Sequence, residues 1–78
     1  MEEDETRGVM LISMAAGQGS AFAYYCLGFF RRYGRFGLAN DLKETARWFR
    51  KAQSSAVQDT AVGMRKTMAD FLREHPEL

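Results

Sequence analysis

Residues 23–52, AYYCLGFFRRYGRFGLANDLKETARWFRKA, decide the fold expected of this 78-residue chain. Apolar residues recur at helical spacing on both sides of a short stretch that contains Gly34 and Gly37. Both glycines can adopt the positive φ that a tight turn requires. Asp41, or Asn40 before it, can cap the helix that follows the turn, and Glu44 lies three residues after Asp41, as in a capping box. This stretch therefore predicts an antiparallel helical hairpin.

Two more helices are expected, one on each side of the hairpin. Helical periodicity places the four helices at roughly 3–16, 20–32, 41–54 and 56–74. Ser20 is a candidate N-cap for the second helix. The single proline, Pro76, lies near the C-terminus, where it interrupts none of them. No alternation typical of a strand extends beyond four residues. The predicted fold class is all-α, with about four helices in one domain over residues 1–78.

Composition restricts the class of protein. Hydrophobic residues make up 46% of the chain and charged residues 27%, as in a folded globular protein. The net charge of +1 gives no overall field that would attract nucleic acid or a membrane. One cysteine and one histidine cannot build a disulfide framework or a zinc cluster. The acidic start, MEEDE, is unlike a signal peptide, and no apolar run reaches membrane-spanning length. We therefore expect an intracellular, cytoplasmic protein with no metal, no cofactor and no membrane partner.

Parts of the hairpin recur elsewhere in the chain, which indicates a repeat. Pairs at a spacing of 37 are Leu11 with Trp48, Ile12 with Phe49 and Ala15 with Ala52. Pairs at a spacing of 35 are Ala21 with Ala56, Leu27 with Val62 and Gly28 with Gly63. The pattern predicts the second helix of one repeat, one complete repeat over residues 15–52, and the first helix of a third.

Nine residues in this region follow the pattern of a known helical repeat. They are Ala23, Leu27, Gly28, Gly34, Gly37, Asp41, Trp48, Phe49 and Ala52. The chain resembles the Sel1-like repeat, a relative of the tetratricopeptide repeat, over about residues 15–52. The resemblance implies a short solenoid of stacked hairpins. It departs from the family at Phe36, which lengthens the loop by one residue, and at Ala39, where a proline is common.

The same resemblance implies a function. Members of this family are typically protein–protein interaction modules, adaptors and assembly factors. The implied protein is a non-catalytic scaffold or adaptor whose partner is another protein or a second copy of itself. No GxSxG, HExxH, P-loop or Rossmann glycine pattern occurs, so we expect no enzymatic activity.

Specific packing positions follow from these patterns. Gly28 is expected where two helices cross closely, because glycine inside a helix otherwise lowers stability. Trp48 and Phe49 are expected to fill the space between helix pairs. Four methionines at helical spacing are expected to fill gaps in the core, although a methionine-rich groove is an alternative. They are Met10, Met14, Met64 and Met68.

The predicted partner-binding residues form a ridge on the second helix: Phe22, Tyr25, Phe29 and Arg32. Their spacing places them on a face away from Ala23 and Leu27. Tyrosine, phenylalanine and arginine are residues that anchor interfaces. The sequence leaves two interpretations open. Either the ridge is an exposed contact surface, or a neighbouring helix covers it.

Two other functions are alternatives. The stretch from Arg31 to Arg50 interleaves arginines with aromatic residues, a composition typical of surfaces that bind single-stranded nucleic acid. The residues that would contact RNA in an accessory protein of that kind are Arg31, Arg32, Arg35 and Arg47. The second of these alternatives is a structural subunit of a large complex.

Overall fold

The computed structural model describes residues 2–78, together with the side chains of residues 6–78. These residues form four helices: α1 (Glu2–Gly17), α2 (Ala21–Tyr33), α3 (Leu42–Ser54) and α4 (Val62–Glu74). No strand occurs in the described part of the chain, where Ser20 and Val57 form an isolated bridge. The predicted all-α class with four helices is confirmed.

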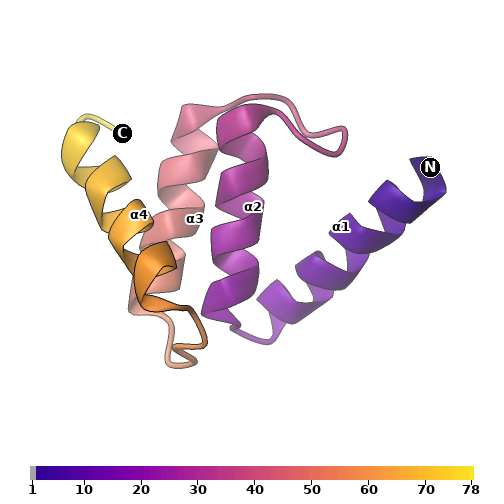
Figure 1. The fold of residues 1–78 in the computed structure, drawn as a ribbon, viewed down its shortest axis with the longest axis horizontal. Coiled ribbons are helices and arrows are strands. Elements are labelled where there is room, and N and C mark those ends of the chain that lie inside the picture. The colour runs from indigo at the N-terminus through magenta and orange to yellow at the C-terminus, as the bar shows by residue number, and fades with distance from the viewer. Residues whose placement is uncertain (1) are drawn as a thin grey trace.

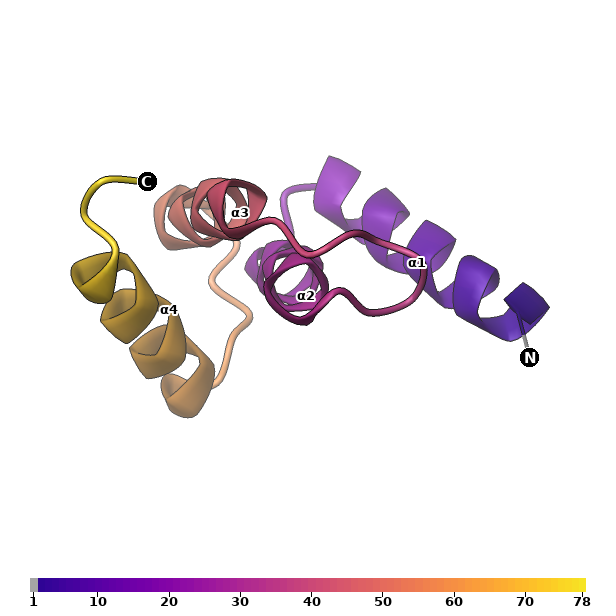
Figure 2. The same cartoon turned by 90° about the horizontal axis from the view of Figure 1, so that it is seen from above.

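The helices α2 and α3 lie antiparallel at the centre of the molecule (Figure 1). α1 lies on one side of this hairpin and α4 on the other, so the two chain ends point away from each other (Figure 1). Seen from above, both outer helices diverge from the central pair (Figure 2). The space between α1 and the hairpin therefore widens toward the N-terminus of α1.

Side-chain caps set the ends of the two central helices. The Ser20 hydroxyl accepts a hydrogen bond from the Ala23 N–H at 3.2 Å and so begins α2. Gly34 ends α2 with φ of 63°. The Asp41 carboxylate begins α3, because it accepts from the N–H groups of Lys43 and Glu44 at 3.0 and 3.2 Å.

The predicted capping box is only half formed. The Asp41 N–H donates to the Arg31 carbonyl at 2.7 Å rather than to the Glu44 side chain. This bond joins the end of the loop to the last turn of α2. In the loop itself, Gly37 has φ of 77° and Phe36 has φ of 56°. A positive φ is unusual for an aromatic residue. The Phe36 ring packs edge-on against Phe30, with the ring centroids 4.7 Å apart.

Phe49 is at the centre of the main core, which joins α2, α3 and α4. Its ring is fully buried, stacks on Tyr25 at 5.9 Å and meets the edge of Phe71 at 5.3 Å. Beside it the buried Thr45 hydroxyl donates to the Gly28 carbonyl at 3.0 Å. A Cβ atom on Gly28 would overlap the Phe49 ring. The predicted close helix crossing at Gly28 is confirmed.

A smaller apolar cluster joins α1 to α2. Ala16 from α1 and Ala23 and Leu27 from α2 are buried there, and Ile12 packs against them. These side chains are smaller than those of the main core. α1 is therefore held mainly along one face near its C-terminal end.

The predicted start of the last helix is wrong. α4 begins at Val62 rather than near residue 56, because the preceding segment pairs with the start of α2. The Ala21 N–H donates to the Val57 carbonyl at 3.2 Å, and the Ser55 hydroxyl donates to the Gly19 carbonyl. Gly63 consequently lies in the first turn of α4, where a Cβ atom would meet nothing within 4 Å. It is not the structural equivalent of Gly28.

The four methionines do not share one role. Met68 is buried in the main core and Met64 is half-buried. Met10 and Met14 are exposed on α1, so their predicted place in the core is wrong. None of the four helices covers the face of α1 that carries Met10 and Met14.

Candidate functional site

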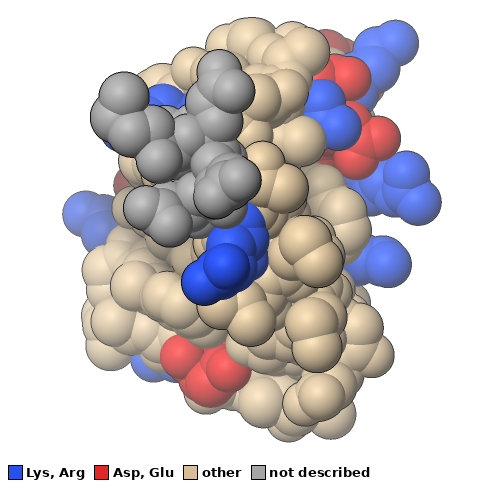
Figure 3. Space-filling view, turned by 90° about the vertical axis from the view of Figure 1, so that its right-hand side faces the viewer, with Lys and Arg blue, Asp and Glu red and all other residues tan. Residues whose placement is uncertain are grey.

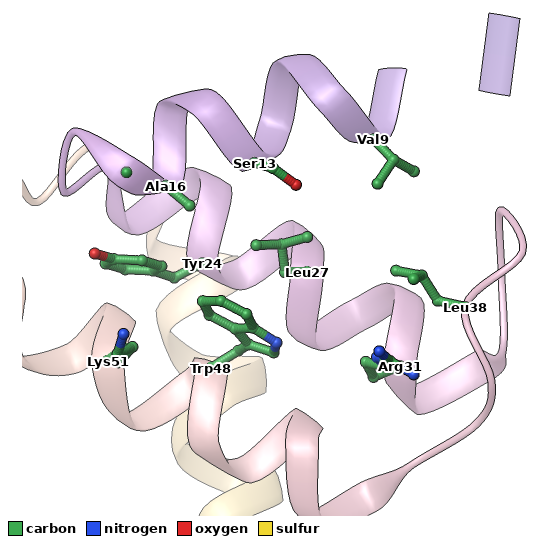
Figure 4. A pocket seen from close by; sticks show the side chains of 10 residues that line it. Val9, Ser13, Ala16, Tyr24, Leu27, Arg31, Leu38, Trp48 and Lys51 are labelled. Atoms are coloured by element: carbon green, nitrogen blue, oxygen red, sulfur yellow. The ribbon is translucent and has the colours of Figure 1, made fainter. Parts of the chain in front are cut away.

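A groove of about 540 Å³ lies between α1 and the α2–α3 hairpin. α1 forms one wall and α3 the other, while α2 forms the floor (Figure 4). The residues that line it are Val9, Ser13, Ala16, Gly17, Tyr24, Leu27, Arg31, Leu38, Trp48 and Lys51. Its volume lies in the range of about 300–1,000 Å³ that is usual for ligand sites.

Two aromatic rings give the groove an apolar surface. Tyr24 and Trp48 stack with their ring centroids 5.8 Å apart and an interplanar angle of 23°. Leu27 lies beside them on α2 (Figure 4). The three side chains come from two helices that the hairpin holds side by side, so the surface is already formed without a ligand.

Trp48 is half-buried and lines this groove, which corrects its predicted place in the core. Successive residues on a helix differ by about 100° in direction. Phe49 therefore points into the core while Trp48 points toward α1. α1 diverges from the central hairpin (Figure 2), and Trp48 beneath it stays half-buried.

The groove is positively charged. The Lys51 Nζ lies 5.5 Å from the centroid of the Trp48 ring and 5.7 Å from that of Tyr24. Arg31 lies at the other end, where its guanidinium donates to the Ala39 carbonyl at 3.2 Å (Figure 4). None of the residues described as lining the groove is acidic. An anionic group entering the groove would therefore meet two cations and no like charge among the described lining side chains.

The predicted ridge on α2 is not one free surface. Tyr25 stacks on Phe49, and the Arg32 guanidinium lies 5.0 Å from the centroid of the Phe71 ring on α4. Phe29 is half-buried beside Tyr25, with ring centroids 6.1 Å apart. Phe22 is the exposed member of the ridge. The role of these four residues in partner binding stays a prediction.

The residues of α2 that line the groove follow a helical spacing in the sequence. Tyr24, Leu27 and Arg31 follow an i, i+3, i+7 spacing, and Trp48 and Lys51 follow i, i+3 on the next helix. The signal was a second apolar face on a helix that is apolar nearly all round. The sequence did not show that α1 would diverge and leave this face open.

The side chains of the four arginines that were predicted to contact RNA lie on different parts of the molecule. Arg31 lines the groove, whereas Arg32 lies over Phe71 on the α4 side. Arg47 pairs with Glu44 at 3.5 Å, and Arg35 lies 5.9 Å from the Phe36 ring in the loop. They do not line one surface along which a nucleic-acid strand would run.

The remaining chemically reactive side chains stand apart from the groove. Cys26 is half-buried, and burial raises the pKa of its thiol. His75 packs against Phe71, with ring centroids 4.6 Å apart. Among the described side chains, no three His, Cys, Asp or Glu residues come together as metal ligands. Within residues 2–78, none of the helices has the length and apolar character needed to cross a membrane.

Comparisons with protein-family models, with curated proteins and with solved structures yield no match for this chain. The resemblance to the Sel1-like repeat therefore stays a prediction.

Proposed function

We propose that this chain is a non-catalytic protein-interaction module of Sel1-like or tetratricopeptide-like hairpins, and that it binds an acidic amphipathic segment of another polypeptide. The observation that carries the proposal is the groove beside α1. It combines the Tyr24–Trp48 stack with Arg31 and Lys51, and none of the described side chains that line it is acidic.

The chemistry of the groove favours this kind of occupant. Apolar side chains gain roughly 25 cal/mol per Å² of apolar surface that they remove from water. Tyrosine and tryptophan are frequent anchors of interfaces. The two cations add selectivity, because acidic groups gain from them while basic groups are repelled. A helix that lays one apolar face into a groove is a common form of peptide recognition.

The arrangement of the helices also fits a repeat-like module. The pairs at a spacing of 37 relate α1 to α3, so α1 would be the second helix of an incomplete repeat. α4 would be the first helix of another. Helical repeats of this kind use surfaces shared between neighbouring repeats for binding. The groove lies at such a junction, between α1 and the complete hairpin.

The proposal can be tested with two synthetic helical peptides, each about 14 residues long. Both carry the same leucine and methionine stripe, with glutamate on the flanks of one and lysine on the flanks of the other. Trp48 is the only tryptophan, so its fluorescence reports on the groove directly. We expect saturable binding of the acidic peptide, weakened by salt.

Charge-reversal variants locate the binding. Lys51→Glu should weaken binding of the acidic peptide by on the order of tenfold, because the reversed charge repels it. Lys66→Glu is the matched control, since Lys66 is exposed on α4 and does not line the groove. Equal binding of both peptides, or no effect of Lys51→Glu, would overturn the proposal. Loss of binding in Phe22→Asp alone would instead favour the ridge.

A further inference from the structure

A second unpartnered surface lies on the outer face of α1. Met10, Leu11 and Met14 are 59%, 59% and 63% exposed, and their spacing places them along one stripe. α2 covers the opposite face of the helix, through Ile12 and Ala16. Figure 3, seen from the α1 side, shows a broad uncharged area beside a basic group and an acidic group. Exposed apolar stripes of this kind often mark interaction sites.

Acidic residues precede this stripe in the sequence of α1. Residues 2–5 are all acidic and Arg7 is basic, so the first two turns of the helix carry a net negative charge. α1 therefore combines an acidic N-terminal end with an exposed apolar stripe, and the segment that the groove is proposed to bind also combines acidic and apolar residues. The groove has a cation at each end, Arg31 and Lys51 (Figure 4). An acidic helix end would therefore meet one of these two cations, whichever way along the groove the helix ran.

We infer that two copies of this chain associate by laying the Met10, Leu11 and Met14 stripe of each α1 into the groove of the other copy. The inference rests on the proposed function, because it uses the same groove. The contact is reciprocal, since each copy has one stripe and one groove. A reciprocal contact of this kind closes into a two-fold dimer and leaves neither surface free to extend a fibre.

The positions of the two faces on α1 allow this arrangement. Ile12 and Ala16 pack α1 against α2 of the same copy, and the stripe lies on the opposite face of α1. In the dimer, the two α1 helices would lie side by side between the two hairpins. Each α1 would then be covered on both faces. The Tyr24 and Trp48 rings would be covered by the stripe of the other copy.

The test is the oligomeric state, measured by sedimentation velocity from roughly 1 μM to roughly 100 μM. We expect the wild-type chain to be a dimer in the upper part of this range. Leu11→Asp damages the stripe and Lys51→Glu damages the groove, so each should weaken dimerisation by at least about tenfold. Val62→Asp is the control, because Val62 is 73% exposed but belongs to neither surface. Circular dichroism confirms that each variant remains helical.

Dimerisation that survives Lys51→Glu would overturn the inference.

A wild-type chain that stays monomeric throughout would also overturn it. If the acidic peptide still perturbs Trp48 in that monomer, only the self-association fails. If neither the peptide nor a second copy perturbs Trp48, the proposed function fails as well.

Discussion

Gly28 and Phe49 are in contact across the crossing of α2 and α3. A Cβ atom on Gly28 would lie 2.6 Å from Cε1 and 2.7 Å from Cδ1 of the Phe49 ring. The ring has little room to move, because Tyr25 stacks on it and Phe71 meets its edge. The absence of a side chain at Gly28 therefore sets how closely the two central helices approach.

Gly28→Ala should destabilise the fold. Alanine favours a helix over glycine by about 1 kcal/mol, but overpacking a rigid core costs about 1–3 kcal/mol. The two terms leave a net loss of up to about 2 kcal/mol in the free energy of unfolding, measured with urea. Gly63→Ala is the control, since a Cβ atom there would meet nothing within 4 Å. A stabilised Gly28→Ala would contradict the packing described.

Phe49→Ala should be far more damaging than Trp48→Ala. The Phe49 ring is fully buried, and removing such a ring costs about 3–5 kcal/mol, which approaches the whole stability of a small domain. Trp48 is half-buried at the groove, so we expect about 1–2 kcal/mol for its removal. Circular dichroism during urea unfolding compares the two. Equal losses would show that both rings belong to the core.

Asp59 should make stability depend on pH. The Ser20 hydroxyl and the Phe22 N–H donate to its carboxylate at 2.6 and 2.8 Å and hold its pKa below the ordinary value of 3.8. Because the pKa is lower in the folded state, the stabilisation is present above that value. It is lost as the pH falls through the lowered pKa.

Unfolding of wild type and Asp59→Asn at several pH values measures this effect. The difference in unfolding free energy between the two should shrink as the pH falls from about 6 to about 3. Ser20→Ala removes the hydroxyl donor and should reduce the same pH dependence. A difference that stays constant with pH would show that the Asp59 hydrogen bonds do not persist in solution.

Cys26 should react slowly with thiol reagents in the folded protein. Burial raises the pKa of its thiol, so less thiolate is present at neutral pH, and the thiolate is the reactive form. The rate with a chromogenic disulfide should increase when urea unfolds the chain. Equal rates in the folded and unfolded states would mean that α2 does not shield the thiol.

The central hairpin was predictable because its signals are local. Ser20 and Asp41 cap helices whose first turns follow directly, and Gly34 and Gly37 supply the positive φ of the loop. Each of these residues acts on backbone groups a few positions away. Local sequence therefore determines where α2 begins and ends and where α3 begins.

The start of α4 depends on partners distant in sequence, so periodicity could not show it. Residues 56–61 contain alanines that favour a helix. They are not helical, because the Val57 carbonyl and the Asp59 carboxylate accept hydrogen bonds from the start of α2. Those donors lie 37 and 39 positions from Asp59.

The groove was not predictable for a related reason. The spacing of Tyr24, Leu27 and Trp48 marks an apolar surface, but it does not tell which helix covers that surface or how completely. The coverage depends on the angle between α1 and the hairpin. The small side chains of Ala16 and Ala23 hold α1 only near one end.

These attachments give the two outer helices different freedom to unfold locally. The segment before α4 is joined to the start of α2 through Ser20 and Asp59, and α4 is joined to α3 through Phe71. We therefore expect α4 to exchange its amide hydrogens together with the central hairpin. α1 should exchange faster, as a separate unit. Whenever α1 detaches, the groove loses a wall, so any occupant that touches both walls must also raise the protection of the α1 amides.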